Sequence, residues 1–272
     1  MHDISGCEAV EHLETNLWSI WSVFGRGPGA RLIDEPDVMA FETPLDRAPY
    51  SGIMRFRSAG GPTLVDDEID RLLAPFRARG VAPMWLVHPT AEPADLGLRL
   101  NARGFDRAER LTGMTSPLGT LPDPDPTPLG IDVFEVAANE PSPWVGLVSW
   151  RYGLPTAARD FLVAVYRNEA VGPGGATRVW VAMRDGVPVA KAALHLHGES
   201  AGVYGVATRP EGRGLGLATQ LTLTALRAAR GTGARIAVLH STPMAVSLYR
   251  RLGFEPIADF DVYAEPGGLD LH

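Results

Sequence analysis

The chain has 272 residues, of which 45% are hydrophobic and 21% are charged, and its formal net charge is −7 at pH 7. This composition predicts a soluble globular protein with room for two ordinary domains. The negative charge and the lack of a basic cluster argue against nucleic-acid binding. No apolar run approaches the roughly 20 residues that span a bilayer, so no membrane association is expected.

The single cysteine, Cys7, excludes an intramolecular disulfide and fits a reducing, cytoplasmic compartment. The most apolar early stretch, residues 17–24, follows acidic rather than basic residues and is a poor signal peptide. The seven histidines show no metal-ligand spacing, so no metal site is predicted.

The first half of the chain contains short segments with clear periodicity. Trp18 and Trp21 lie three residues apart on an expected first helix, where core packing explains them best. Residues 69–76 have helical spacing, and Pro75 predicts a kink or an early end to that helix. An apolar strand over residues 84–87 and a short helix over residues 93–100 follow.

A proline-rich stretch separates the two halves. Residues 117–128 read PLGTLPDPDPTP and contain five prolines, which favour an extended spacer. We therefore predict one domain over residues 1–118, a linker over 119–129 and a second domain over 130–272.

The second half alternates strands and helices, which predicts an α/β (α+β) domain with a mixed sheet. The expected elements are strands over residues 178–183, 187–196, 201–207 and 234–240, helices over 216–230 and 243–252, and closing strands over 255–264. Both halves also contain the motifs ARG, H, P and GF in the same order. In the first half they are at residues 78–80, 88, 93 and 104–105, and in the second half at residues 229–231, 240, 243 and 253–254. We interpret this order as an internal duplication.

The most informative segment is VATRPEGRGLGLATQ, residues 206–220. A glycine-rich turn there joins a strand to a helix, whose first N–H groups can bind a pyrophosphate. The segment lacks the Lys-Ser/Thr pair that a P-loop requires. It also lacks the acidic residue that follows a dinucleotide-binding fingerprint. The remaining pattern, Arg-x-x-Gly-x-Gly/Ala, is satisfied by Arg213, Gly216 and Ala218.

With LYRRLGF following at residues 248–254, the second half resembles the GNAT superfamily of acyl-CoA-dependent N-acyltransferases. The resemblance implies a mixed-sheet GNAT fold in two tandem copies, of which the N-terminal one is degenerate. It also implies acetyl-CoA as the acyl donor, with its pantetheine arm between two splayed strands. The residues implied in binding it are Val206, Ala207, Thr208, Arg213, Gly214, Leu215, Gly216, Leu217, Ala218, Thr219 and Ser241.

Tyr249 matches the GNAT tyrosine that protonates the leaving thiolate, and a phenol is suited to this because its pKa is near 10. Packing in the apolar stripe of the helix is the alternative explanation for this tyrosine. The equivalent residue of the first half is Leu100, which has no proton to donate. The first half is therefore expected to be inactive.

The general base and the acceptor pocket are less clear from the sequence. His197 and Glu199 follow the hairpin beside the expected acetyl-CoA strand and are candidate bases, as are His195, His240 and a water chain. Trp150 and Tyr152 are candidate acceptor-binding residues, with core packing as the alternative.

The predicted function is transfer of an acetyl group from acetyl-CoA to a primary amine by direct attack in a ternary complex. The acceptor is a small-molecule amine or a peptide. The alternatives are a non-catalytic acyl-CoA sensor and an enzyme that acts on a protein N-terminus or lysine. A homodimer formed through an exposed closing strand is also considered.

Overall fold

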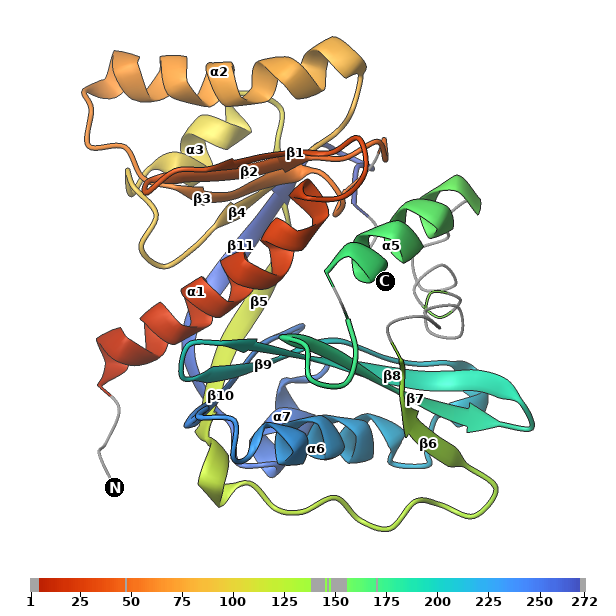
Figure 1. Ribbon diagram of the computed structural model, residues 1–272. Coiled ribbons are helices and arrows are strands. Elements are labelled where there is room, and N and C mark those ends of the chain that lie inside the picture. The colour runs from red at the N-terminus through yellow and green to blue at the C-terminus, as the bar shows by residue number, and fades with distance from the viewer. Residues whose placement is uncertain are drawn as a thin grey trace. The chain divides into compact units, whose positions relative to one another are not determined.

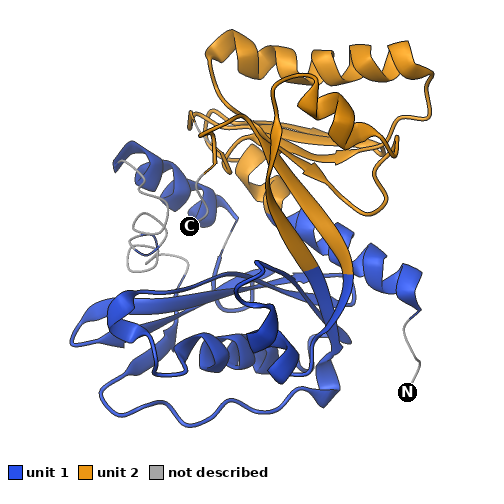
Figure 2. Ribbon diagram, turned by 180° about the vertical axis from the view of Figure 1, so that it is seen from behind, with its two compact units in different colours: residues 1–20, 113–257 blue, residues 21–112, 258–272 orange. Residues whose placement is uncertain are grey.

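The computed structural model describes residues 5–46, 48–137, 145, 147, 156–169 and 171–269. The chain forms two compact units, and each of them is discontinuous in sequence (Figure 2). Unit 1 contains residues 1–20 and 113–257, and unit 2 contains residues 21–112 and 258–272.

Unit 1 is built on a mixed sheet with the strand order β5-β10-β9-β8-β7-β6 (Figure 1). Strands β9 and β10 are parallel, whereas the β6–β7, β7–β8 and β8–β9 pairs are antiparallel. The strand bounds are β5 Asp106–Pro117, β6 Asp132–Glu135, β7 Thr177–Arg184, β8 Val187–His197, β9 Ser200–Thr208 and β10 Ile236–Ser241. Only the second part of β5, from residue 113, belongs to this unit.

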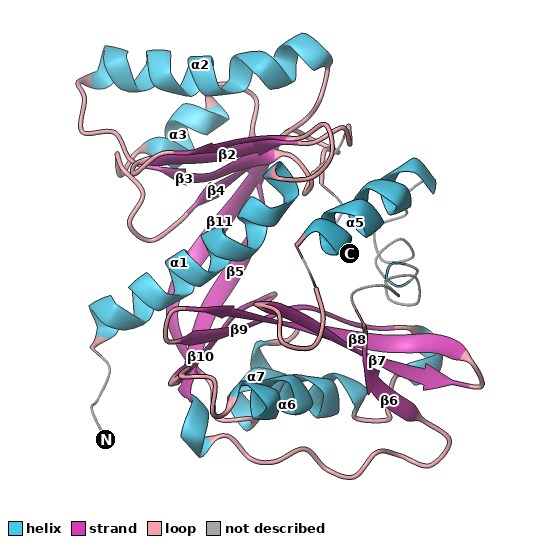
Figure 3. Ribbon diagram, viewed as in Figure 1, coloured by secondary structure: helices cyan, strands magenta, loops and turns pink. Residues whose placement is uncertain are grey.

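Helices cover both faces of the unit 1 sheet (Figure 3). Helices α6 (Leu217–Ala229) and α7 (Val246–Arg251) lie on one face, and their apolar residues form a core with alternate residues of the strands. Helix α5 (Thr156–Asn168) and the unit 1 part of α1 (Gly6–Gly25) lie on the other face. Polar side chains on α6, such as Arg227, stay exposed, so the helix is amphipathic as its spacing predicts.

Unit 2 repeats part of this arrangement. Its strand order is β1-β2-β3-β4-β11-β5, and β3 and β4 are parallel. Helices α2 (Pro62–Arg79) and α3 (Leu96–Asn101) pack on β1 to β4. The strand bounds are β1 Arg31–Asp34, β2 Val38–Glu42, β3 Gly52–Phe56, β4 Met84–Val87 and β11 Glu255–Ala264.

The two units differ from the predicted domains at both ends of the chain. Residues 258–264 of β11 pair with β4 of unit 2, with Asp261 opposite Val87 and Tyr263 opposite Trp85. The first 20 residues belong to unit 1. Pairing with β4 decides the membership of β11, and side-chain contacts such as that of Asn16 with Ser200 hold the first helix to unit 1. Composition along the chain does not reveal either of them. Because β11 lies between β4 and β5, it is not the exposed closing strand that was considered for dimerisation.

The proline-rich stretch is also more than a spacer. It begins with a short 3-10 helix, Leu118–Thr120, and then runs along unit 1 in an extended conformation. Leu121 is buried, the Thr127 hydroxyl accepts a hydrogen bond from Gln220 at 2.8 Å, and Arg230 binds Asp123 at 2.7 Å. These contacts with α6 and the residue after it attach the stretch to unit 1.

Several predicted elements are confirmed within a few residues, including the four strands of residues 178–240 and the helix after the glycine-rich turn. The early end considered at Pro75 does not occur, because α2 continues through the proline to Arg79 and ends at Gly80. The buried face of α2 runs past the proline to Phe76, and this packing outweighs the missing hydrogen bond.

Candidate active site

An opening lies between strands β9 and β10 of unit 1. Their parallel pairing runs from Ser200 opposite Ile236 to Val203 opposite Leu239 and ends there. Strand β9 nevertheless continues to Thr208 and β10 to Ser241. The β10-facing edge of β9 beyond Val203 is therefore available to a ligand that pairs with backbone.

A β-bulge changes the direction of β9 at the start of this opening. Tyr204 pairs with Ala193 of β8 and Ala207 pairs with Lys191, so two residues of β9 face one residue of β8. Gly205 adopts the left-handed conformation with φ 54°. A bulge of this kind bends the strand away from its neighbour, and glycine permits the required conformation. The backbone of Val206 and the following residues is thus turned out of the regular ladder.

The glycine-rich turn follows directly and ends in the N-terminus of α6. Gly214 and Gly216 are left-handed, with φ 76° and 72°, and Gly216 is the residue before the helix. No side chain caps this helix start. Among the described residues, no loop or cap acceptor is found for the N–H groups of residues 214–219. These groups, together with the positive end of the helix dipole, form a cradle suited to an anion.

Arg213 takes a smaller part than its place in the motif suggests. Its N–H donates to the carbonyl of Pro210 at 3.1 Å, so its backbone is already engaged. Its side chain is exposed and can add only a screened charge. The cradle therefore begins at Gly214, and it continues through Leu215, Gly216, Leu217 and Ala218 to Thr219.

The end of β9 carries a buried polar atom without a protein partner. The Thr208 hydroxyl finds no hydrogen-bond partner among the described residues, although Thr208 pairs with Ala190 through its backbone. A buried hydroxyl in this state loses the free energy of a hydrogen bond, which a polar ligand can restore. At the end of β10, the Ser241 hydroxyl instead donates to the carbonyl of Thr242 at 2.9 Å, so its proton is already engaged.

Tyr249 lies on α7, on the same side of the sheet as α6. Its side chain is 8% exposed and packs edge-on against Phe254, with ring centroids 6.0 Å apart. Burial raises the pKa of its phenol to about 12, and the Thr222 hydroxyl acts in the opposite direction. The phenol therefore keeps its proton at neutral pH. Val206 of the bulged strand packs against the apolar cluster to which Tyr249 also belongs.

The opposite face of the opening is polar and is covered by α1. The Tyr204 hydroxyl donates to Asn16 Oδ1 at 2.7 Å, and the Asn16 amide donates to Ser200 Oγ at 2.8 Å. The Tyr204 ring stacks on His240 with centroids 6.2 Å apart. Glu14, which is only 2% exposed, lies close enough to act on the pKa of His240. Residues 14–16 of the first helix thus complete this side of unit 1.

His240 lies one residue beyond the last β9–β10 pair. Burial lowers the pKa of its imidazole to about 3, and the Glu14 carboxylate only partly opposes this. The imidazole is therefore neutral at pH 7, and its low pKa makes it a weak base. It fits a packing and hydrogen-bonding role beside Tyr204 better than proton uptake.

The lowered pKa of His240 predicts a loss of stability in mild acid. The unfolded chain binds a proton near pH 6.5 and the folded chain does not, so stability is complete above pH 6.5 and falls towards pH 3. At pH 5 this one group lowers the free energy of unfolding by about 2 kcal/mol relative to pH 7. We expect His240→Gln to remove that part of the pH dependence in denaturant titrations. His197→Gln, at an exposed histidine, should leave it in place.

The structure does not bring the two predicted bases to the opening. His197 pairs with Ser200 at the hairpin end of β9, about 13 Å along the strand from Tyr204. Glu199 lies in the hairpin turn, where its exposed carboxylate binds Arg235 at 2.5 Å. His195 is buried, and its ring nitrogens contact the hydroxyls of Thr177 at 2.8 Å and Ser19 at 2.9 Å.

The predicted acceptor residues Trp150 and Tyr152 lie outside the described residues. Trp18 is buried as expected, and Trp21 stacks on Phe41 within unit 2 at 5.9 Å. The sequence reasoning missed Lys191 and the bulge opposite it. The glycine within GVYGVAT is the signal that points to a bulge, because a glycine inside a strand often marks one.

The equivalent opening in unit 2 is filled by its own chain. Strands β3 and β4 pair only at Gly52–Met84 and Ile53–Trp85. Beyond these pairs, the Phe56 N–H donates to His88 Nε2 at 3.3 Å. The Phe56 carbonyl accepts from the Glu92 N–H at 3.3 Å, and the Ser58 N–H donates to the Glu92 carbonyl at 3.2 Å. Phe56 and Ser58 follow the last pair by three and five residues, as Val206 and Thr208 do in unit 1.

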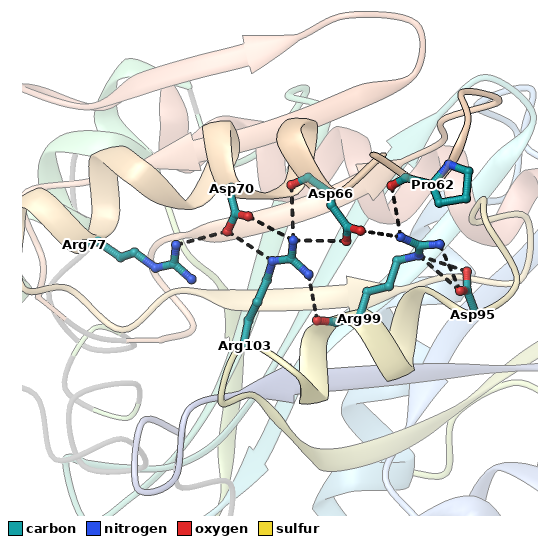
Figure 4. Close-up of polar contacts among 7 residues, drawn as sticks. All are labelled: Pro62, Asp66, Asp70, Arg77, Asp95, Arg99 and Arg103. Atoms are coloured by element: carbon teal, nitrogen blue, oxygen red, sulfur yellow. Dashed lines mark hydrogen bonds and ion pairs between the residues drawn. The ribbon is translucent and has the colours of Figure 1, made fainter. Parts of the chain in front are cut away.

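Charged side chains also fasten α2 to α3 in unit 2 (Figure 4). Arg103 binds Asp66 at 3.0 Å and Asp70 at 2.9 Å, and Arg99 binds Asp66 at 2.9 Å. Hydrogen bonds from these arginines lower the pKa of both carboxyls. The carboxylate of Asp66 is thus neutralised by two arginines. The filled opening is the feature that distinguishes this half from unit 1.

The two units are nevertheless built alike around their GF motifs. The Phe254 N–H donates to the Tyr249 carbonyl at 3.0 Å, and the Phe105 N–H donates to the Leu100 carbonyl at 3.1 Å. Leu100, which is fully buried, therefore occupies the position of Tyr249. The expected equivalence of these two residues is confirmed by this shared hydrogen bond.

A family model for the acetyltransferase (GNAT) domain matches residues 175–256. In structure, a GCN5-related N-acetyltransferase from Kribbella flavida is similar to the chain, with a TM-score of 0.65 and 23% identity. That likeness covers 92% of this chain and 96% of the other. A tandem GNAT protein of the clavulanic acid biosynthesis pathway matches with a TM-score of 0.61 and 14% identity, covering 97% of this chain and 96% of its own.

A GCN5-related N-acetyltransferase from Sphaerobacter thermophilus has a TM-score of 0.57 and 16% identity, over 86% of this chain and 75% of its own. At these identities the structural likeness concerns the fold. No curated protein matches the chain in sequence. Within the part of the chain that the structure describes, no helix is long and apolar enough to cross a membrane, and no cluster of potential metal ligands is found.

Proposed function

We propose, from the GNAT acetyltransferase domain at residues 175–256 and the tandem GNAT fold around it, that the protein is an N-acetyltransferase. In this proposal acetyl-CoA binds to unit 1, and its acetyl group moves to a primary amine. Acyl-CoA-dependent acetyl transfer is the general activity of the family. The amine acceptor and the residues in named roles are the proposed part.

The single observation that carries the proposal is the anion cradle at the start of α6. Its N–H groups from Gly214 to Thr219 lie beside the opening between β9 and β10. A pyrophosphate fits the cradle, and a pantetheine arm with amide groups fits the exposed backbone of Val206, Ala207 and Thr208. The orphaned Thr208 hydroxyl offers a further hydrogen bond. The residues present therefore suit a CoA thioester.

The chemistry needs three contributions from the chain. The neutral amine attacks the thioester carbonyl, and the N–H of Val206 or Ala207 at the bulge stabilises the oxygen as it becomes negative. The carbon–sulfur bond then breaks, and Tyr249 donates its phenolic proton to the leaving thiolate. Its raised pKa keeps that proton in place until the thiolate forms. The products are an N-acetylated amine and free CoA.

A CoA-release assay over a panel of alkyl amines, polyamines, aminoglycosides and peptides tests the proposal. We expect release with at least one of these classes, and the class identifies the acceptor. Acetyl-CoA binding without release over the whole panel would support a non-catalytic acyl-CoA sensor instead. Release with peptides alone would support an enzyme that acts on a protein N-terminus or lysine.

The filled opening of unit 2 predicts that each chain binds one acetyl-CoA. The backbone of Phe56 and Ser58, which corresponds to that of Val206 and Thr208 in unit 1, is already paired with Glu92. Titration calorimetry of the full chain should give a stoichiometry near one. Two equal sites would contradict the assignment of unit 2 as the inactive copy.

A further inference from the structure

The chain contains a single lysine. Of its 25 basic residues other than histidine, Lys191 is the one lysine and the others are arginines. An arginine stays charged in a protein, whereas a buried lysine loses its proton readily and can act as a nucleophile. Lys191 is therefore the one side chain of the sequence that carries an aliphatic amine.

Lys191 lies in the middle of β8, at the bulge that opens the active site. Its side chain is 7% exposed, and its backbone pairs with Val181 of β7 and Ala207 of β9. A Cβ atom added at Gly205 would lie 2.6 Å from Lys191 Nζ. The amine thus occupies the side-chain space of Gly205, immediately before the Val206 N–H proposed to bind the thioester oxygen.

The amine lies on the face of the sheet opposite Tyr249 and α6. Alternation along β8 places Lys191 on the same face as His195, which contacts Ser19 of α1. Tyr249 and the cradle helix α6 lie on the other face. A thioester bound between these faces would have an amine on its α1 side to attack the carbonyl. It would have a proton donor on its α6 side for the leaving sulfur.

We propose that Lys191 is an internal acetyl acceptor, which takes the acetyl group from acetyl-CoA bound to unit 1. The inference rests on the proposed function. The neutral amine forms a bond to the thioester carbonyl carbon, the carbon–sulfur bond breaks, and CoA leaves as a thiol with the proton from Tyr249. The nitrogen loses one proton, which restores the phenol through solvent. The products are acetyl-Lys191 and CoA, and no oxidant or other co-reactant is needed.

The surroundings favour the reactive form of the amine. Burial lowers the pKa of the Lys191 ammonium to about 8, so about a tenth of it is neutral at pH 7 and most of it at pH 9. Titratable groups on this face include Tyr204 of β9, His195 of β8, His240 of β10 and Glu14 of α1. Helix α5, on the same face, carries Arg159, Asp160, Tyr166 and Arg167. Desolvation by burial is the cause of the lowered pKa of Lys191.

Self-acetylation would limit the enzyme's own activity. An amide at Lys191 is not an acyl donor, so the group stays in place once it has been transferred. The added acetyl group removes the charge and occupies space beside the bulge. We therefore expect the acetylated chain to bind acetyl-CoA and to release less CoA with an external amine.

Mass spectrometry of the full chain incubated with acetyl-CoA tests the proposal directly. Each acetyl group adds about 42 Da, and a trideuterated acetyl donor separates new groups from any already present. Trypsin cuts after unmodified Lys191 and not after acetyl-Lys191, so peptide mapping distinguishes this site from the N-terminal amine. We expect labelling of Lys191 that rises about tenfold between pH 7 and pH 9.

Three variants decide the interpretation. Labelling should fall about 100-fold or more in Tyr249→Phe and should be absent from the 191 peptide in Lys191→Arg. Tyr263→Phe, which removes a buried phenol from unit 2, should leave it unchanged. An acetyl group already present on Lys191 of the purified protein, and absent from purified Tyr249→Phe, would equally support the proposal.

The outcomes also separate this inference from the proposed function. Calorimetric binding of acetyl-CoA without label on Lys191 from pH 7 to pH 9.5 would overturn the inference and leave the proposed function standing. Equal labelling in Tyr249→Phe, or in the unfolded chain, would show uncatalysed chemistry and would also overturn it. Absence of acetyl-CoA binding to the folded protein would remove both.

Discussion

Replacing Tyr249 by phenylalanine should lower kcat by about 100-fold or more while acetyl-CoA still binds. The change removes only the phenolic oxygen from a side chain that is 8% exposed and packed against Phe254. The apolar contacts remain, so the fold should be kept. The leaving thiolate, however, loses the proton that the raised pKa holds in place. Steady-state kinetics with the best acceptor of the panel and calorimetry with acetyl-CoA measure the two effects.

The matched control is Tyr263→Phe, at another tyrosine that is at least nine-tenths buried. Tyr263 belongs to unit 2, where it pairs with Trp85, so its loss tests the general effect of removing a buried phenol. It should leave kcat unchanged. If Tyr249→Phe also retained kcat, the residue would be part of the core only, and a different proton donor would be needed.

An aspartate at position 218 should abolish acetyl-CoA binding without harming the fold. Ala218 is the second residue of α6 and is partly exposed. A carboxylate there interacts favourably with the helix dipole, by about 0.3 to 1 kcal/mol. The same charge repels a pyrophosphate bound to the N–H groups of residues 214–219. We expect affinity to fall by about 100-fold or more, equivalent to about 3 kcal/mol, with an equal or higher Tm.

Thr63→Asp provides the matched control, because Thr63 is the second residue of α2 in unit 2. It places the same charge at the same position of the equivalent helix, and it should leave acetyl-CoA affinity unchanged. Arg213→Ala is expected to weaken binding by only about threefold, since an exposed cation contributes little. A larger loss with Arg213→Ala than with Ala218→Asp would show that the side chain, and not the helix start, holds the phosphates.

The local parts of the site could be predicted from the sequence because short-range rules determine them. Glycines at 214 and 216 adopt left-handed conformations before the helix, and the GF motif fixes Tyr249 by one hydrogen bond. The resemblance to GNAT proteins then gave these residues a function. The prediction that Leu100 replaces Tyr249 in the first half is supported by the same hydrogen bond there.

What could not be predicted depends on contacts between distant parts of the sequence. Nothing in residues 14–16 indicates that Asn16 binds Ser200 and Tyr204, which are more than 180 positions away. The membership of β11 in unit 2 rests on its pairing with β4, again across a long separation. His197 and Glu199 were chosen for their chemistry near a strand end, but the relevant end of β9 is the other one. Lys191 was overlooked because a lysine in a strand is usually solvated.

The most direct test of the whole account is a crystal structure of the full chain with acetyl-CoA bound. The account predicts the two phosphates against the N–H groups of Gly214 to Thr219, the pantetheine along Val206 and Thr208, and the sulfur beside the Tyr249 hydroxyl. Acetyl-CoA bound at the start of α2 in unit 2, or bound elsewhere with these N–H groups left to solvent, would contradict it.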